Sequence, residues 1–155
     1  MTVLFLRHAH AEDDHDGDFG RRLTPKGLQQ SEKVGRFLLR NGLEPDLILS
    51  SPVVRARQTA ELVAQVLGLP LTIAEWLACG LKPGTVFEKT AALAGRPTVL
   101  LVGHEPDFSQ AVSAWIGAPR PDMIEVKKAS VTALDVFLHA REGARLLYSV
   151  PPRLM

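Results

Sequence analysis

Three runs of apolar residues are continuous along the chain and do not alternate with polar residues. They occupy residues 3–6 (VLFL), 47–49 (LIL) and 98–102 (TVLLV). Continuous apolar runs are typical of strands buried on both faces, because other elements cover both sides of a parallel sheet. The three runs therefore predict strands of a parallel central sheet.

Helical spacing of apolar residues and helix-start signals lie between and after these runs. Thr24 with Pro25, and Ser51 with Pro52, are each typical of an N-cap residue followed by a first helical residue. Thr85 begins a capping box, which also predicts a helix start. With the turn residues that end each pattern, four helices are expected over about residues 24–41, 51–68, 85–95 and 105–116.

The end of the chain predicts a change from parallel to antiparallel pairing. Residues 129–137 and 144–150 have strand character, and the short segment 141–143 between them favours a hairpin. Strands alternating with four helices, followed by extra strands, predict an α/β fold in a single domain over residues 1–155. The expected architecture is a three-layer α/β/α sandwich with a mostly parallel central sheet and antiparallel C-terminal strands. In such folds, ligands bind beyond the carboxyl ends of the strands.

Composition and charge exclude several classes of protein. The 155 residues include 18 Lys plus Arg and 17 Asp plus Glu, a formal charge of +1, which gives no overall field for nucleic acid or an acidic membrane. The single cysteine, Cys79, cannot form an internal disulfide. Only four consecutive apolar residues precede Arg7, too few for a signal peptide or a membrane span. We therefore expect a soluble, cytoplasmic protein.

Basic and imidazole side chains collect where the expected strands end. Arg7 and His8 follow the first run, Arg55 lies about one turn into the helix after the second, and His104 follows the third. Taken singly, these residues are as typical of a surface turn, a solvated charge or a structural histidine as of a site. Together they would place several hydrogen-bond donors at one edge of the sheet, where an anion would bind.

This cluster suits phosphoryl transfer. Arginine offers a planar pair of donors that stays charged, and neutral imidazole is a nucleophile near neutral pH. We expect His8 to accept the phosphoryl group and Arg7, Arg55 and His104 to grip its nonbridging oxygens. The two arginines should disfavour protonation of His8, and donors of this kind remove the need for a metal or other cofactor. Water would then cleave the phosphohistidine intermediate.

Four stretches resemble the histidine phosphatase superfamily, also called phosphoglycerate mutase-like, and above all its small SixA-type phosphohistidine phosphatase branch. They are LRHAHA at 6–11, RRLTPKG at 21–27, LILSSPVVRARQTAE at 47–61 and LVGHEP at 101–106. The resemblance implies that His8 is the phosphorylated histidine and that Arg7, Arg55 and His104 complete the phosphate pocket. It also implies that Arg21 faces the site and binds substrate.

Two departures from the family pattern bear on substrate. Ala9 replaces the glycine that commonly follows the histidine, and a small side chain is tolerated there if φ is negative. Larger members supply a leaving-group acid from an insertion, but here residues 75–84 are short and their one acid, Glu75, is expected to be a surface charge. A missing acid favours phosphohistidine over a sugar phosphate, because imidazole leaves readily at neutral pH. The short connection also predicts an open site.

Other interpretations stay open at this point. The acidic stretch at residues 12–18, with His8 and His10 nearby, invites a metal-dependent hydrolase, although a solvated loop is the simpler interpretation and no metal is expected. The same pocket could serve a small-molecule phosphomonoesterase or a phosphate-binding module without turnover. The expected partner is thus a phosphorylated protein or a small phosphorylated metabolite.

Overall fold

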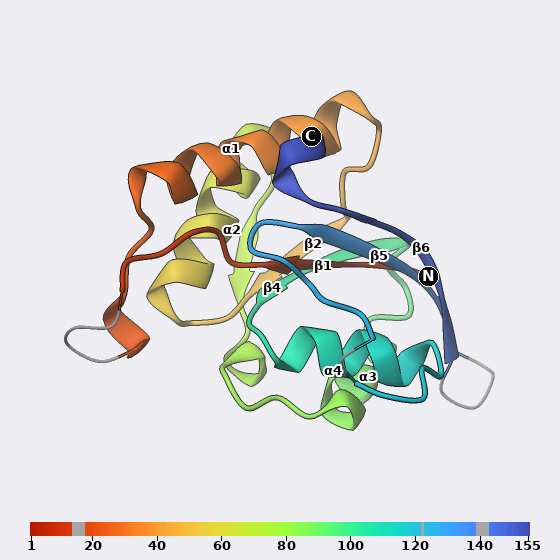
Figure 1. Ribbon diagram of the computed structural model, residues 1–155. Helices are drawn as coiled ribbons and strands as arrows, with labels where there is room; N and C mark the ends of the chain where they lie inside the picture. The colour runs from red at the N-terminus through yellow and green to blue at the C-terminus, as the bar shows by residue number, and fades with distance from the viewer. Residues whose placement is uncertain (14–17, 122, 139–142) are drawn as a thin grey trace.

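The computed structural model describes residues 1–13, 18–121, 123–138 and 143–155 (Figure 1). One six-stranded sheet runs through the centre of the molecule. Its strands are β1 (Thr2–Arg7), β2 (Leu47–Ser50), β3 (Leu71–Ile73), β4 (Thr98–Gly103), β5 (Val131–Phe137) and β6 (Gly143–Val150). The helices are α1 (Pro25–Arg40), α2 (Val54–Leu67), α3 (Pro83–Ala91) and α4 (Asp107–Trp115), with short 3-10 turns η1 (Asp18–Gly20), η2 (Glu75–Leu77) and η3 (Pro152–Leu154).

The sheet is mixed, as the sequence predicts. Its strand order is β3-β2-β4-β1-β5-β6. The first four of these strands are parallel, whereas β5 pairs antiparallel with β1 and β6 pairs antiparallel with β5. The predicted fold class, an α/β sandwich with a parallel core and antiparallel C-terminal strands, is confirmed.

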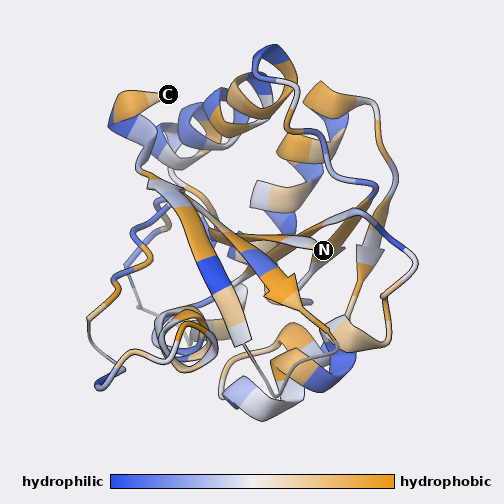
Figure 2. Ribbon diagram, turned by 90° about the vertical axis from the view of Figure 1, so that its right-hand side faces the viewer, coloured by the Kyte–Doolittle hydropathy of each residue, from blue (hydrophilic) through white to orange (hydrophobic). Residues whose placement is uncertain are grey.

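Helices cover both faces of the sheet (Figure 1). Helices α1 and α2 pack on one face, and α3 and α4 pack on the other. Side chains of β1 alternate between the two cores: Leu4 and Leu6 join the cluster under α1 and α2, while Val3 and Phe5 join the cluster under α3 and α4. Figure 2 shows largely hydrophobic strands in the middle and helices in which hydrophobic and hydrophilic residues are mixed. Burial on both faces explains the continuous apolar runs.

One predicted helix start is confirmed and two are wrong. Thr24 is the N-cap of α1, and its hydroxyl accepts a hydrogen bond from the backbone N–H of Gly27 at 3.2 Å. The prediction for Ser51 is wrong: α2 begins at Val54, and the Ser51 hydroxyl binds the Val53 N–H ahead of the helix. The capping box at Thr85 is also wrong, because α3 already begins at Pro83, whose fixed φ suits the first helical position.

Further corrections concern the ends of elements. Helix α3 ends at Ala91, earlier than expected, and α4 begins at Asp107. Strand β5 begins at Val131 because Ala129 has a φ of 55°, the left-handed region, and turns the chain. Residues 141–142 of the expected hairpin turn lie outside the described residues. No helix in the described part of the chain is long and apolar enough to span a membrane.

Candidate active site

The pairing of β1 with β4 brings two histidines together. Arg7 of β1 lies opposite Gly103 of β4, so the next residues in both strands, His8 and His104, leave the sheet side by side. The His8 N–H also donates to the Gly103 carbonyl at 3.0 Å. The two imidazole rings have centroids 5.4 Å apart, although 96 positions separate them in the sequence. The two histidines thus meet at the carboxyl edge of the sheet, as predicted.

The hydrogen bonds of His8 define which ring nitrogen carries a lone pair. Nδ1 lies 2.8 Å from the Ala9 carbonyl, which can only accept, so Nδ1 carries the proton. Nε2 accepts a hydrogen bond from Nε of Arg55 at 3.1 Å. His8 is 6% exposed. The ring is therefore a neutral imidazole whose Nε2 lone pair points toward the guanidinium group of Arg55.

Burial, above all, keeps His8 neutral. Its pKa is lowered to about 3, chiefly because burial disfavours the imidazolium form, and only then by the charges of Arg55, His104 and Arg7. The arginines lower the pKa of His8, as the sequence predicts, but burial is the larger cause. The two arginines make a smaller contribution than the loss of water.

Arg55 is held by α2 and buried beside His8. It is 4% exposed, and its Nη2 lies 3.8 Å from Sγ of Cys79. One turn later, the Thr59 hydroxyl donates to the Arg55 carbonyl at 2.7 Å and accepts from the Ala9 N–H at 3.1 Å. Gln58 accepts the Leu23 N–H at 2.8 Å. Gln58 and Thr59 therefore connect two loops of the site to α2 through hydrogen bonds.

His104 is 2% exposed, and its Nε2 shares a 2.8 Å hydrogen bond with the Ser51 hydroxyl. Ser51 follows β2, and its N–H donates to the Val102 carbonyl at 2.9 Å. Ser51 therefore orients a site histidine as well as the chain that enters α2. Sequence reasoning missed this role because the cap-like SP pair offered a sufficient local explanation.

Arg7 has a cationic donor that nothing in the described residues accepts. Its Nη1 donates to the Val126 carbonyl at 3.2 Å, but Nε is buried with no acceptor within hydrogen-bond reach in the described structure. Burial lowers the pKa of Arg7, while the charges of Glu105 and Glu125 partly oppose that shift. An unsatisfied buried N–H on a guanidinium is costly, and a bound oxyanion would satisfy it.

Arg21 and Lys128 are two further basic residues whose charges are related to that of Arg7. Nε of Arg21 donates to the Glu12 carbonyl at 2.6 Å. The pKa of Lys128 is lowered, first by burial and then by the positive charges of Arg7, Arg21 and Lys26. Arg7 and Arg21 both act on Lys128, and the predicted contact of Arg21 with substrate stays a prediction. Lys128 was not predicted, because its place depends on the turn from Val126 to β5.

Acidic residues at three places bear on whether the site has a general acid or a metal ion. Glu75 is exposed at the start of η2, as expected of a surface charge. Glu105, directly after His104, is half-buried, and burial raises its pKa. In the acidic stretch, Glu12 accepts the Arg22 N–H at 3.1 Å, and residues 14–17 lie outside the described residues. In the described ranges, no three His, Cys, Asp or Glu residues are grouped where they could hold a metal ion.

Known protein families and sequences match this chain. A family model for the histidine phosphatase superfamily (branch 1) matches residues 3–78. The chain is 31% identical over 140 residues to the phosphohistidine phosphatase SixA of Escherichia coli. The aligned region covers 87% of this chain and 86% of that protein. The chain is also 33% identical over 139 residues to an uncharacterized protein of Picosynechococcus, covering 86% and 84%.

Solved structures show the same relationship. A structure of the protein histidine phosphatase SixA in complex with tungstate matches with a TM-score of 0.89 and 25% identity, covering 99% of this chain and 98% of that one. SixA from Agrobacterium tumefaciens matches with a TM-score of 0.80 and 27% identity, covering 97% and 98%. The chain belongs to the histidine phosphatase superfamily, branch 1. Within it, the chain resembles the SixA phosphohistidine phosphatases in both sequence and structure.

Proposed function

We propose that this protein is a cofactor-independent phosphatase that removes phosphate from phosphohistidine on proteins, through a covalent intermediate on His8. The observation that carries the proposal is the state of the His8 ring. It is neutral, its Nε2 lies 3.1 Å from Nε of Arg55, and the ring of His104 and the next residue in the chain, Arg7, lie beside it. A tetrahedral oxyanion placed there would meet a nucleophile and several donors at once.

The reaction has two displacements at phosphorus. In the first, His8 Nε2 forms a bond to phosphorus while the bond from phosphorus to the leaving nitrogen breaks, and that nitrogen takes up a proton from solvent. The Arg55 N–H that now binds the lone pair can turn to a phosphoryl oxygen. In the second, water attacks phosphorus, His8 regains its lone pair and inorganic phosphate is released. The donors of Arg7, Arg55 and His104 would stabilise the negative charge in both steps.

Two observations favour phosphohistidine as the substrate: the acidic residues of the connection at 75–84 and the similarity to SixA proteins. Glu75 is exposed, and the connection of residues 75–84 supplies no other carboxylate. A protein imidazole needs less help from an acid than an alkoxide does. The similarity to SixA phosphohistidine phosphatases, one of them solved with tungstate, points to the same substrate class. We therefore favour a phosphorylated protein over a small phosphorylated metabolite.

A substrate panel tests this proposal. Initial rates are compared for a phosphohistidine peptide, a phosphoserine peptide and a sugar phosphate, with and without a chelator. We expect the phosphohistidine peptide to be preferred by at least about 100-fold, in line with the rate that a missing general acid costs, and the chelator to have no effect. Equal rates on the sugar phosphate would favour a small-molecule phosphomonoesterase, and binding without turnover a phosphate-binding module.

Trapping of the intermediate is the second test. Brief reaction with radiolabelled phosphohistidine peptide, quenched without acid, should leave label on the protein in an acid-labile, base-stable bond. His8→Ala should lose both the label and turnover. Label that persists in His8→Ala, or a chelator effect that a divalent ion reverses, would overturn the proposed mechanism.

A further inference from the structure

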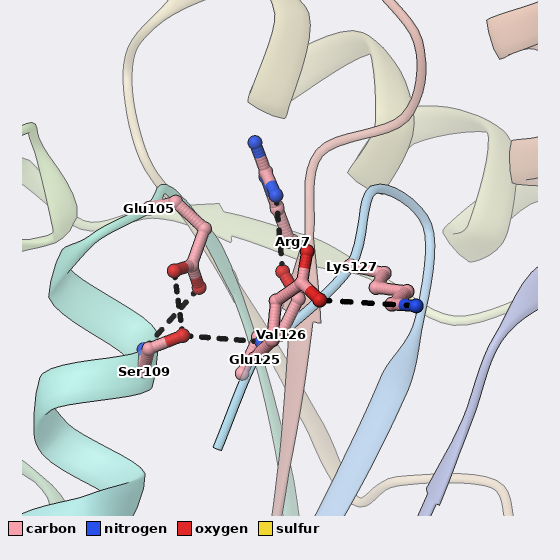
Figure 3. A network of polar contacts seen from close by, with 6 residues as sticks. All are labelled: Arg7, Glu105, Ser109, Glu125, Val126 and Lys127. Carbon is pink, nitrogen blue, oxygen red and sulfur yellow. Dashed lines mark hydrogen bonds and ion pairs between the residues drawn. The ribbon is translucent and has the colours of Figure 1, made fainter. Parts of the chain in front are cut away.

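A chain of hydrogen bonds connects Glu105 to the guanidinium of Arg7 (Figure 3). The Ser109 hydroxyl donates to Oε2 of Glu105 at 2.5 Å, and the Ser109 N–H donates to Oε1 at 3.2 Å. The same hydroxyl oxygen accepts the Val126 N–H at 3.1 Å. The Val126 carbonyl then accepts Nη1 of Arg7 at 3.2 Å.

The order of donors in this chain gives Glu105 a specific effect on Ser109. A serine hydroxyl has one proton and two lone pairs. Because the proton is directed to the Glu105 carboxylate, a lone pair remains for the Val126 N–H. Ser109 is 7% exposed, so water cannot easily replace either partner. The carboxylate therefore fixes the hydroxyl in the orientation that holds Val126.

Val126 and the turn after it form hydrogen bonds with both the side chain and the backbone of Arg7. The Val126 side chain is fully buried in the core under α3 and α4, which limits movement of its backbone. Its carbonyl binds the Arg7 guanidinium, while the Ala129 N–H binds the Arg7 backbone carbonyl at 3.0 Å. If Val126 lost its bond to Ser109, the carbonyl that orients the guanidinium would lose one of its two anchors.

We propose that Ser109, oriented by Glu105, is a positioning residue that aims the Arg7 guanidinium at bound phosphate. The inference rests on the proposed function, in which Arg7 binds the phosphoryl group. A guanidinium binds an oxyanion best through two parallel N–H groups, so its orientation matters as much as its charge. Ser109 touches no reacting atom and acts through Val126 and Arg7.

Binding of inorganic phosphate, measured by titration calorimetry, tests the inference. Ser109→Ala removes the acceptor for the Val126 N–H, and we expect the Kd for phosphate to rise about 3- to 10-fold, the range for one hydrogen bond. With the phosphohistidine peptide, KM should rise by a similar factor. Ser113→Ala is the matched control, because Ser113 is 1% exposed one turn later in α4 and its hydroxyl donates to the Pro121 carbonyl at 3.1 Å. It should change the Kd less than about 2-fold.

A pair of substitutions at Glu105 separates hydrogen bonding from charge. Glu105→Gln and Glu105→Leu both remove the negative charge near Arg7, but only Gln keeps an oxygen that can accept the Ser109 hydroxyl proton. We expect Glu105→Gln to retain phosphate affinity and Glu105→Leu to lose about as much as Ser109→Ala. Equal affinity of the two Glu105 variants would show that the carboxylate does not act through Ser109 and would overturn its part in the proposal.

A double-mutant cycle with Arg7→Met identifies the route of the effect. If Ser109 acts through Arg7, adding Ser109→Ala to Arg7→Met should raise the Kd by less than about 2-fold. Equal losses from Ser109→Ala in both backgrounds, or equal effects of Ser109→Ala and Ser113→Ala, would overturn the inference. An Arg7→Met protein that binds phosphate as tightly as the native protein would instead contradict the proposed function itself.

Discussion

A single buried imidazole is central to the chemistry that we propose for this site. His8 would be a poor nucleophile if it were protonated, and burial keeps it neutral more effectively than the neighbouring arginines do. A hydrogen bond also restricts the ring to one tautomer, because Nδ1–H donates to the Ala9 carbonyl. A neutral ring with its lone pair on Nε2 is the state that the proposed attack on phosphorus requires.

The low pKa of His8 predicts a loss of stability in acid. In the folded chain His8 takes up a proton only near a pKa of about 3, whereas in the unfolded chain it does so near the ordinary value of 6.5. Below 6.5 the unfolded state therefore binds more protons, so the free energy of unfolding falls as pH decreases toward 3. Between about pH 7 and about pH 4 the native protein should lose on the order of 3 kcal/mol more than His8→Asn.

Denaturant unfolding of both proteins at the two pH values measures this difference. Other groups titrate in both proteins, so their contributions cancel in the comparison. Parallel losses in the native protein and in His8→Asn would show that the folded-state pKa of His8 is not depressed.

At the scale of elements, α1 packs closely against the loop that carries the site. A Cβ added to Gly27, in the first turn of α1, would lie 2.0 Å from the His10 carbonyl oxygen. Gly27→Ala must therefore push α1 away from the residues that follow His8. We expect a loss of about 1–3 kcal/mol in stability, as for other overpacked sites, and a lower kcat/KM.

Gly84→Ala is the control for this prediction. Gly84 lies in the first turn of α3, and an added Cβ would meet nothing within 4 Å. Because alanine favours helix, Gly84→Ala should gain up to about 1 kcal/mol and leave kcat/KM unchanged. Thermal unfolding and steady-state kinetics of the two variants check both statements. A Gly27→Ala protein with native stability would mean that the loop adjusts at no cost.

The elements that sequence predicted well are those with strong local signals. Continuous apolar runs identified β1, β2 and β4, and their carboxyl ends located His8 and His104. Strand β3 gave a weak signal because Thr72 and Ile73 are exposed at the edge of the sheet. Sequence had no local signal for Ser109 or Lys128, whose relation to Arg7 depends on how α4 and the turn before β5 pack.

At the scale of the whole molecule, the net positive charge is small, but basic side chains gather in one place. The formal charge of the chain is only +1. Yet the pKa of Lys128 is lowered by burial and then by the charges of Arg7, Arg21 and Lys26, with Asp13 opposing the shift. Attraction of a phosphorylated substrate should therefore depend on this local group of cations and not on the net charge.

Lys128 allows a direct test of that local field. It is half-buried among cations, whereas its neighbour Lys127 is exposed and lies 3.7 Å from a Glu125 carboxylate oxygen. Lys128→Met should raise KM for a phosphohistidine peptide about 3- to 10-fold with little change in kcat, because it weakens encounter and ground-state binding. Lys127→Met should leave KM within about 2-fold, since an exposed, paired charge contributes little.

Raising salt from about 50 to about 300 mM should lower kcat/KM of the native protein more than that of Lys128→Met, because screening removes an attraction that the variant already lacks. Equal salt dependence in both proteins would mean that Lys128 does not contribute to the field that substrate meets.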